Sequence, residues 1–175
     1  MAAKKIKGVT TYGSISGIYF RKILSTIVYV GELERPGLRV LDFGCGHGVL
    51  KASNPHIDIT GFDIVSALSE VDDWKGVAFD LVVSNEVFYS FSKQQLEQLL
   101  DEFKAYNNDM ELVVGISRQS SINKLGAILL GHADPHGATK LSSREETKVL
   151  LRHLNIVDRN TVWGLADVYR LKFKS

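Results

Sequence analysis

The sequence predicts an α/β fold built on a doubly wound, mostly parallel β-sheet, and two motifs carry that prediction. The first is a short apolar run, Arg39–Phe43, that leads through a glycine-rich loop into a helical stretch beginning at Val49. A strand, a glycine turn and a helix N-terminus together form a nucleotide-binding corner. The second is an acid, Asp63, which ends another strand-like run about 20 residues past the first glycine, where nucleotide-binding folds grip a ribose.

The spacing of the glycine loop separates the candidate ligands. Glycine stands at every second position, at Gly44, Gly46 and Gly48, so the third glycine comes one residue early for the dinucleotide fingerprint. No Lys follows directly, as a phosphate loop would require. The glycines permit a tight turn and leave room for a ligand against bare backbone. The remaining pattern is an acid, one spacer and G-x-G-x-G, and a glycine turn without a ligand is the alternative.

This pattern resembles motif I of the class I S-adenosylmethionine (SAM) methyltransferases. In that family the residue matching Asp42 helps to hold the methionine end of the ligand, and the glycines pass beneath it. SAM carries an ammonium and a sulfonium, so an acid beside the loop suits it electrostatically. The resemblance implies SAM as cofactor and S-adenosylhomocysteine (SAH) as product. It implies a cofactor site formed by Asp42, Gly44, Cys45, Gly46, Gly48, Asp63, Ile64, Asp73 and Asn85.

The second motif spans residues 57–64. Its alternating apolar residues read as a strand, and Asp63 lies at the carboxyl end of that strand. A carboxylate can accept hydrogen bonds from both hydroxyls of a ribose. We therefore expect Asp63 to bind the ribose, and a helix-capping or turn role is the alternative.

Length and composition set further bounds. At 175 residues we expect one methyltransferase domain, with residues 1–35 as an N-terminal helical cap and residues 36–175 as a SAM-binding core. The net charge of +1 provides no global field to attract nucleic acid. A single cysteine, Cys45, excludes a disulfide framework and favours a reducing cytoplasm. No uncharged stretch approaches the roughly 18 residues that span a membrane.

The N-terminal helix is predicted to begin after Ser14 and to run through Val30. In the resembled family such a helix often covers the SAM pocket or shapes the acceptor site. Packing on the sheet edge is the simpler interpretation, and aromatic and basic residues at 19–22 leave a weak membrane-surface role open. Apolar residues at three- and four-residue steps form its inner face: Ile15, Ile18, Tyr19, Ile23, Ile27 and Val30.

Between Asp63 and Asp80 the chain is shorter than in the resembled family, which places a helix, a third strand and another acid there. The resemblance implies that Asp73, or its neighbour Asp72, meets the adenine amino group while Trp74 covers the ring. A solvated acidic turn with a half-buried Trp74 is an equal alternative.

Residues 79–89 resemble motif IV of the family, a strand that leads into a loop. The resemblance implies that Asn85 lines the methionine end. Glu86 is a candidate to face the acceptor, and a surface or capping role is its alternative. Methylases of base amino groups usually carry Asn-Pro-Pro-aromatic here, and this chain lacks both prolines, which argues against that chemistry.

The remaining pattern predicts helices over 93–106, 120–130 and 143–154 and strands over 111–116, 156–163 and 168–173. The last two strands turn at Gly164 and are expected to be antiparallel. The resemblance thus covers almost all of the chain after Arg35. It implies a Rossmann-like doubly wound sheet of the class I methyltransferase type, mostly parallel, with an antiparallel last strand and a shortened third-strand region.

The loop over 131–141 concentrates His132, Asp134 and His136 in a segment rich in Pro and Gly. It is similar to the loop before the last helix in ubiquinone-pathway O-methyltransferases, where a His lies on the acceptor side. A hydroxyl acceptor must lose a proton, and His suits that near neutral pH. We predict His136, with His132 as alternate, as the base or orienting residue. A plain loop is as plausible, and metal binding by these three residues is a weak third reading.

The sequence therefore predicts a cytoplasmic SAM-dependent methyltransferase that acts on a small-molecule, lipid or glycan acceptor. A non-catalytic SAM- or nucleotide-binding module is the alternative, favoured by the short third-strand region. A methylase of RNA or protein comes third, because the charge is near neutral.

Overall fold

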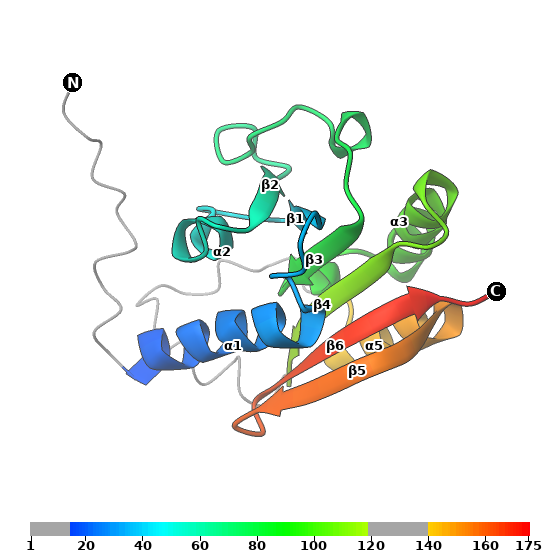
Figure 1. Cartoon of the computed structure of the whole chain (residues 1–175). Coiled ribbons are helices and arrows are strands. Elements are labelled where there is room, and N and C mark those ends of the chain that lie inside the picture. The colour runs from blue at the N-terminus through cyan, green and yellow to red at the C-terminus, as the bar shows by residue number, and fades with distance from the viewer. Residues whose placement is uncertain (1–14, 119–139) are drawn as a thin grey trace.

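The computed structural model describes residues 15–118 and 140–175, and within them six strands form one sheet in the order β2-β1-β3-β4-β6-β5 (Figure 1). Strands β1 to β4 run parallel to one another, and β6 runs antiparallel to both β4 and β5. The predicted fold class is confirmed, including the antiparallel last strand. The strands are β1 (Arg39–Phe43), β2 (Asp58–Phe62), β3 (Leu81–Asn85), β4 (Glu111–Ser117), β5 (Leu154–Val162) and β6 (Ala166–Phe173).

Helices cover both faces of this sheet. Helices α1 (Ile15–Gly31) and α2 (Val49–Ser53) share a buried cluster with one face, and α3 (Lys93–Tyr106) and α5 (Ser143–His153) share another with the opposite face. The predicted N-terminal helix thus packs on the sheet, although Ile18 is half exposed. The helix predicted over 120–130 lies outside the described residues.

The starts of α3 and α5 follow from local chemistry. Ser92 and Gln95 form a reciprocal capping box at the first helix, and Ser142 and Glu145 form the same box at the second. Each box satisfies backbone N–H groups that a helix start leaves without partners. Both helices then bury one apolar stripe against the sheet.

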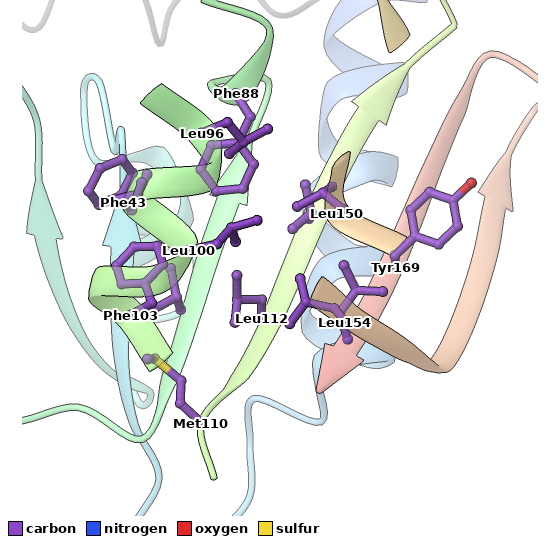
Figure 2. Packing of buried hydrophobic residues seen from close by; sticks show 14 of the residues in the cluster. Phe43, Phe88, Leu96, Leu100, Phe103, Met110, Leu112, Leu150, Leu154 and Tyr169 are labelled. Atoms are coloured by element: carbon purple, nitrogen blue, oxygen red, sulfur yellow. The ribbon is translucent and has the colours of Figure 1, made fainter. Parts of the chain in front are cut away.

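The larger core cluster lies between the sheet, α3 and α5 (Figure 2). Phe43 from β1 contacts Phe103 from α3 edge-on, with ring centroids 5.5 Å apart. Leu112 from β4 and Leu150 from α5 extend this cluster toward Tyr169 on β6. The core therefore holds β1, the strand that leads into the glycine loop, against the rest of the sheet.

The segment between β2 and β3 contains no strand, in agreement with the predicted shortening. Its only helix is a 3-10 turn, η2 (Trp74–Gly76). Glu70 occupies the free edge of β2 instead. Its backbone N–H donates to the Gly61 carbonyl at 2.9 Å, and its Oε2 accepts from the Gly61 N–H at 3.2 Å. Lys51 on α2 holds the same carboxylate at 2.7 Å.

The closing hairpin lies close to its predicted position. The last helix ends at His153, and β5 begins at Leu154, whose backbone is already extended and pairs with Phe173. Gly164 adopts φ 70° in the turn, as the sequence predicts for a turn glycine. Across residues 15–118 and 140–175, no helix combines the length and hydropathy that crossing a bilayer requires.

Candidate cofactor and acceptor site

All three glycines of the loop have positive φ angles: 80° at Gly44, 53° at Gly46 and 66° at Gly48. A Cβ at Gly44 would overlap the Val87 side chain, so this position needs glycine for packing. A Cβ at Gly46 or Gly48 would meet no atom within 4 Å. The second and third glycines therefore face open space, as a loop that carries a ligand requires.

Asp42 on β1 is only 6% exposed. Burial, followed by the nearby carboxylates of Asp63 and Glu70, raises the pKa of its carboxyl to about 7. Negative charge thus accumulates around the loop, with Lys51 paired to Glu70. A ligand with an ammonium and a sulfonium would stabilise the ionised form of Asp42, so this site fits the cofactor that the loop predicts.

Asp63 lies directly after β2 and binds the glycine loop. Its Oδ2 accepts from the Gly46 N–H at 2.9 Å, and its Oδ1 accepts from the Val65 N–H at 2.9 Å. A carboxylate offers about four lone-pair positions, so two bonds leave acceptor capacity for ribose hydroxyls. The next residue, Ile64, is 94% exposed, an apolar surface that a purine ring could cover.

Replacing Asp63 with Ala is expected to raise the dissociation constant for SAH about 10- to 100-fold, because charge-assisted bonds are lost. Calorimetric titration of the variant and parent measures this. Asp58→Ala, at the exposed start of the same strand, is the matched control and should bind like the parent. Parent-like affinity in Asp63→Ala would remove the ribose assignment.

A cavity of about 370 Å³ opens beside the loop, within the usual range for small-molecule sites. Sequence reasoning found Asp42, Cys45, Gly46 and Gly48 in its lining. It missed the others, because they depend on how α2 and the shortened segment pack against the loop. The missed lining residues are His47, Lys51, Ala52, Gly61, Ala67, Leu68 and Glu70.

Cys45 is a packed residue rather than a nucleophile. Burial, followed by the carboxylates of Asp42, Asp63 and Glu70, raises the pKa of its thiol to about 12. A thiol that stays protonated at neutral pH is a poor nucleophile. Its Sγ lies so close to Gly61 that a Cβ at Gly61 would approach it to 2.9 Å.

The adenine-side residues have other partners in this structure. The side chain of Asp73 caps η2 by accepting from the Lys75 N–H at 3.0 Å. Trp74 is 6% exposed and packs on Phe103, with ring centroids 4.8 Å apart. A buried indole cannot also cover an adenine ring, so that part of the interpretation does not fit. Asp73 as an adenine contact stays a prediction.

Asn85 ends β3, which lies between β1 and β4 in the sheet. Its Oδ1 is buried and has no hydrogen-bond partner among the described residues. The side chain lies over Gly115 of β4, where a Cβ would overlap it. An unpartnered polar group at a strand's carboxyl end is available to a ligand, and its predicted role at the methionine end stays a prediction.

Glu86 follows Asn85 with a φ of 58°, a left-handed conformation that is uncommon for residues other than Gly, Asn and Asp. Such strain concentrates at functional sites. Its Oε1 is buried without a hydrogen-bond partner in the described chain. Burial raises the pKa of this carboxyl, while the hydroxyl and backbone of Ser117 lower it. Its neighbour Val87 packs on Gly44, so Glu86 lies next to the cofactor loop.

Glu146 on α5 is a second buried carboxylate in the same region, only 2% exposed. Burial, followed by the charge of Glu86, raises its pKa to about 8. The pKa of Tyr89 is raised by burial, then by Glu86 and Glu146. Burial also raises the pKa of Tyr19 on α1, where Ser117 opposes the shift and Glu86 adds to it.

These five residues, named here the acceptor-side cluster, are Tyr19, Glu86, Tyr89, Ser117 and Glu146. Of these five, the sequence analysis named only Glu86 as a candidate to face the acceptor. The sequence does contain a signal for Glu146. This glutamate interrupts the apolar stripe that Val149 and Leu150 continue on the same helix.

The predicted acceptor histidines, His132 and His136, lie outside the described residues, as does the weak metal site that they would form with Asp134. Within residues 15–118 and 140–175, no group of three or more potential ligands gathers to hold a metal ion. The histidine roles stay predictions.

The parallel sheet, the acid before the glycine loop and the second acid after β2 define a class I SAM-dependent methyltransferase. The comparison with known families agrees. The chain belongs to the methyltransferase domain family, whose model matches residues 16–157. No curated protein matches the chain.

Solved methyltransferases share this fold at low sequence identity. The N-methyltransferase NodS from Bradyrhizobium japonicum WM9 aligns with a TM-score of 0.66 and 16% identity over 90% of this chain and 98% of that one. Magnesium protoporphyrin IX methyltransferase from Synechocystis PCC 6803, with bound SAH, gives 0.58 and 15% over 99% and 90%. The dimethyltransferase RosA from Streptomyces davawensis gives 0.59 and 18% over 91% and 55%. SAM is the cofactor of this class.

Proposed function

We propose that this protein transfers a methyl group from SAM to a small-molecule acceptor, a class that includes lipid and glycan intermediates. The observation that carries the proposal is the adjacency of two features. The glycine loop and Asp42 form a cavity suited to SAM. The acceptor-side cluster lies beside this loop, because Glu86 directly follows β3, the strand next to β1. Bound SAM would supply an electrophilic methyl group on its sulfonium.

The residues of this chain divide the work. Asp42 would hold the methionine end, Asp63 the ribose, and Ile64 the adenine. Methyl transfer needs the acceptor atom close to the methyl carbon and in line with it, so positioning supplies most of the rate. The acceptor-side cluster is where that positioning would occur, because the carboxyl ends of parallel strands form the ligand crevice.

The structural relatives support a small acceptor. They are an N-methyltransferase, a magnesium protoporphyrin IX methyltransferase and an N,N-8-amino-8-demethyl-D-riboflavin dimethyltransferase. We also propose a cytoplasmic location, because the single cysteine favours a reducing compartment.

Thermal unfolding tests cofactor binding directly. SAM or SAH at 100 times its dissociation constant should stabilise the folded protein by about 2.7 kcal/mol. For a chain of this length that predicts a rise in melting temperature of about 5–10 °C. ATP and NAD at equal concentrations are the controls, because the loop lacks a phosphate-binding Lys. The absence of any shift with SAM and SAH at millimolar concentration would refute the proposal.

A further inference from the structure

The acceptor-side cluster contains two carboxylates and no opposing positive charge. The groups that shift the pKa of Glu86 or Glu146 are neutral or acidic: Ser117 for the first and Glu86 for the second. Within residues 15–118 and 140–175, neither Glu86 nor Glu146 forms an ion pair. Arg118, the next residue after Ser117, pairs with Asp167 instead.

Independent geometric features indicate that a ligand completes this charge arrangement. Glu86 Oε1 is a buried acceptor without a hydrogen-bond partner in the described chain. Its backbone holds φ 58°, a conformation that costs free energy and persists only when the surrounding structure enforces it. Glu146 is 2% exposed on an otherwise apolar helix face. Burying carboxylates without a counter-charge is costly, so these positions suit a cationic partner.

The position of the pair is appropriate for an acceptor. Val87, next to Glu86, packs on Gly44 of the cofactor loop. Glu146 approaches from α5, on the opposite face of the sheet from Tyr19 on α1. A molecule held between the two carboxylates would therefore lie at the carboxyl end of β3, beside the cofactor loop.

We propose that the methyl acceptor is an amine, which enters as its ammonium ion and is held by the carboxylates of Glu86 and Glu146. This inference rests on the proposed methyltransferase function. An ammonium brings a positive charge and up to three N–H donors, enough to bond both carboxylates. A hydroxyl brings one donor and no charge, so it would not favour the ionised form of either carboxyl group.

The pair also provides for the proton that the amine must lose. An ammonium nitrogen has no free electron pair, so one N–H proton first transfers to Glu86 Oε1. The nitrogen lone pair then forms the new N–C bond while the C–S bond breaks and its electron pair stays on sulfur. The product is a methylated ammonium, and Glu86 returns its proton to solvent, which balances atoms and charge.

The first experiment identifies the atom that is methylated. The full chain is incubated in EDTA with SAM carrying a ¹³C-methyl group and a panel of aliphatic, aromatic and sugar amines, each matched by the alcohol of the same carbon skeleton. The ¹³C chemical shift of the product separates N-methyl from O-methyl groups. We expect N-methyl products and none from the alcohols. O-methyl products, a requirement for divalent metal, or no turnover of any amine would overturn the proposal.

Binding provides a readout that needs no turnover. The amine that is methylated is titrated into the SAH complex of the parent, Glu86→Gln and Glu146→Gln by calorimetry. Each substitution keeps the side-chain shape and removes the charge, so affinity should fall about 10- to 100-fold. Glu145→Gln, on the exposed side of the same helix turn, keeps its capping box and should bind like the parent. Equal amine affinity in all four proteins would contradict the proposal.

The two proposals fail in different ways. A chain that binds neither SAM nor SAH is not the methyltransferase proposed above. A chain that binds SAH but methylates oxygen, or holds amines equally well without Glu86 and Glu146, remains a methyltransferase whose acceptor is not an amine. Circular dichroism of each variant confirms that it folds before either comparison is made.

Discussion

Asp42→Asn is expected to make the ligand-free protein more stable at pH 8 while it loses cofactor binding. The raised pKa of Asp42, about 7, means that the folded state holds a proton that the unfolded chain releases near pH 4. As pH rises from about 4 to about 7, the ionised buried carboxylate increasingly penalises folding, and above pH 7 the penalty is complete. Asparagine removes that charge, so the free energy of unfolding at pH 8 should rise by about 2–4 kcal/mol.

Urea unfolding of parent and variant at pH 4 and pH 8 measures this effect. The difference between them should be large at pH 8 and shrink toward pH 4, where the folded carboxyl is protonated and the unfolded one is about half protonated. Asp58→Asn, an exposed acid in the neighbouring strand, is the control and should show no such pH dependence. A variant less stable than the parent at pH 8 would show that Asp42 has a stabilising partner instead.

Cofactor affinity should change in the opposite direction. The positive charges of SAM would favour the ionised Asp42, and removing one member of a buried charge pair typically costs about 3 kcal/mol, or about 100-fold in affinity. The parent should also release a proton on binding SAM near pH 7, seen as a buffer-dependent enthalpy in calorimetry. Unchanged SAM affinity in Asp42→Asn would remove this residue from the site.

Gly46→Ala is expected to abolish SAM binding with only a modest loss of stability. At φ 53° any other residue adopts the left-handed region at a cost of about 1–2 kcal/mol. The new methyl group would meet no protein atom within 4 Å, so the fold can accept it. It would project into the space beside the loop, where the ligand would lie.

Gly37→Ala is a matched control for that experiment. Gly37 has φ 76° and equally open surroundings, but it lies in the turn before β1, away from the cavity. Both variants should lose similar stability in urea unfolding, and only Gly46→Ala should lose affinity for SAH, by at least about tenfold. Equal affinity in the two variants would mean that the ligand does not pass over Gly46.

The features predicted well from sequence are those set by neighbours along the chain. The glycine loop and Asp63 after its strand depend on residues within a few positions along the chain. Apolar residues that alternate along a strand, or recur every three to four positions along a helix, define the buried face of that element. The type and order of the elements could therefore be predicted from the sequence. Ends shifted by one or two residues, as at Leu154, where strand pairing with Phe173 replaces the last turn of helix.

What escaped the sequence depends on residues far apart in it. Trp74 was a candidate to cover adenine, yet Phe103 from α3 buries it, and no local pattern records that contact. Glu86 follows β3 and Glu146 lies on α5, so the effect of Glu86 on the pKa of Glu146 exists only in the folded chain. The sequence shows only that Glu146 is a charged residue within an apolar stripe. The residues that it faces are defined only by the folded structure.

Glu70 provides hydrogen-bond partners at the edge of β2, where this shortened chain has no further strand. An outermost strand exposes backbone groups that can recruit a foreign strand, which is how sheets nucleate aggregation. Here one residue acts as a single rung of an extra strand, since its amide and carboxylate use both backbone groups of Gly61. Lys51 holds it in place. Glu70 thereby makes both backbone groups of Gly61 unavailable to an added strand at the edge of the sheet beside the cofactor cavity.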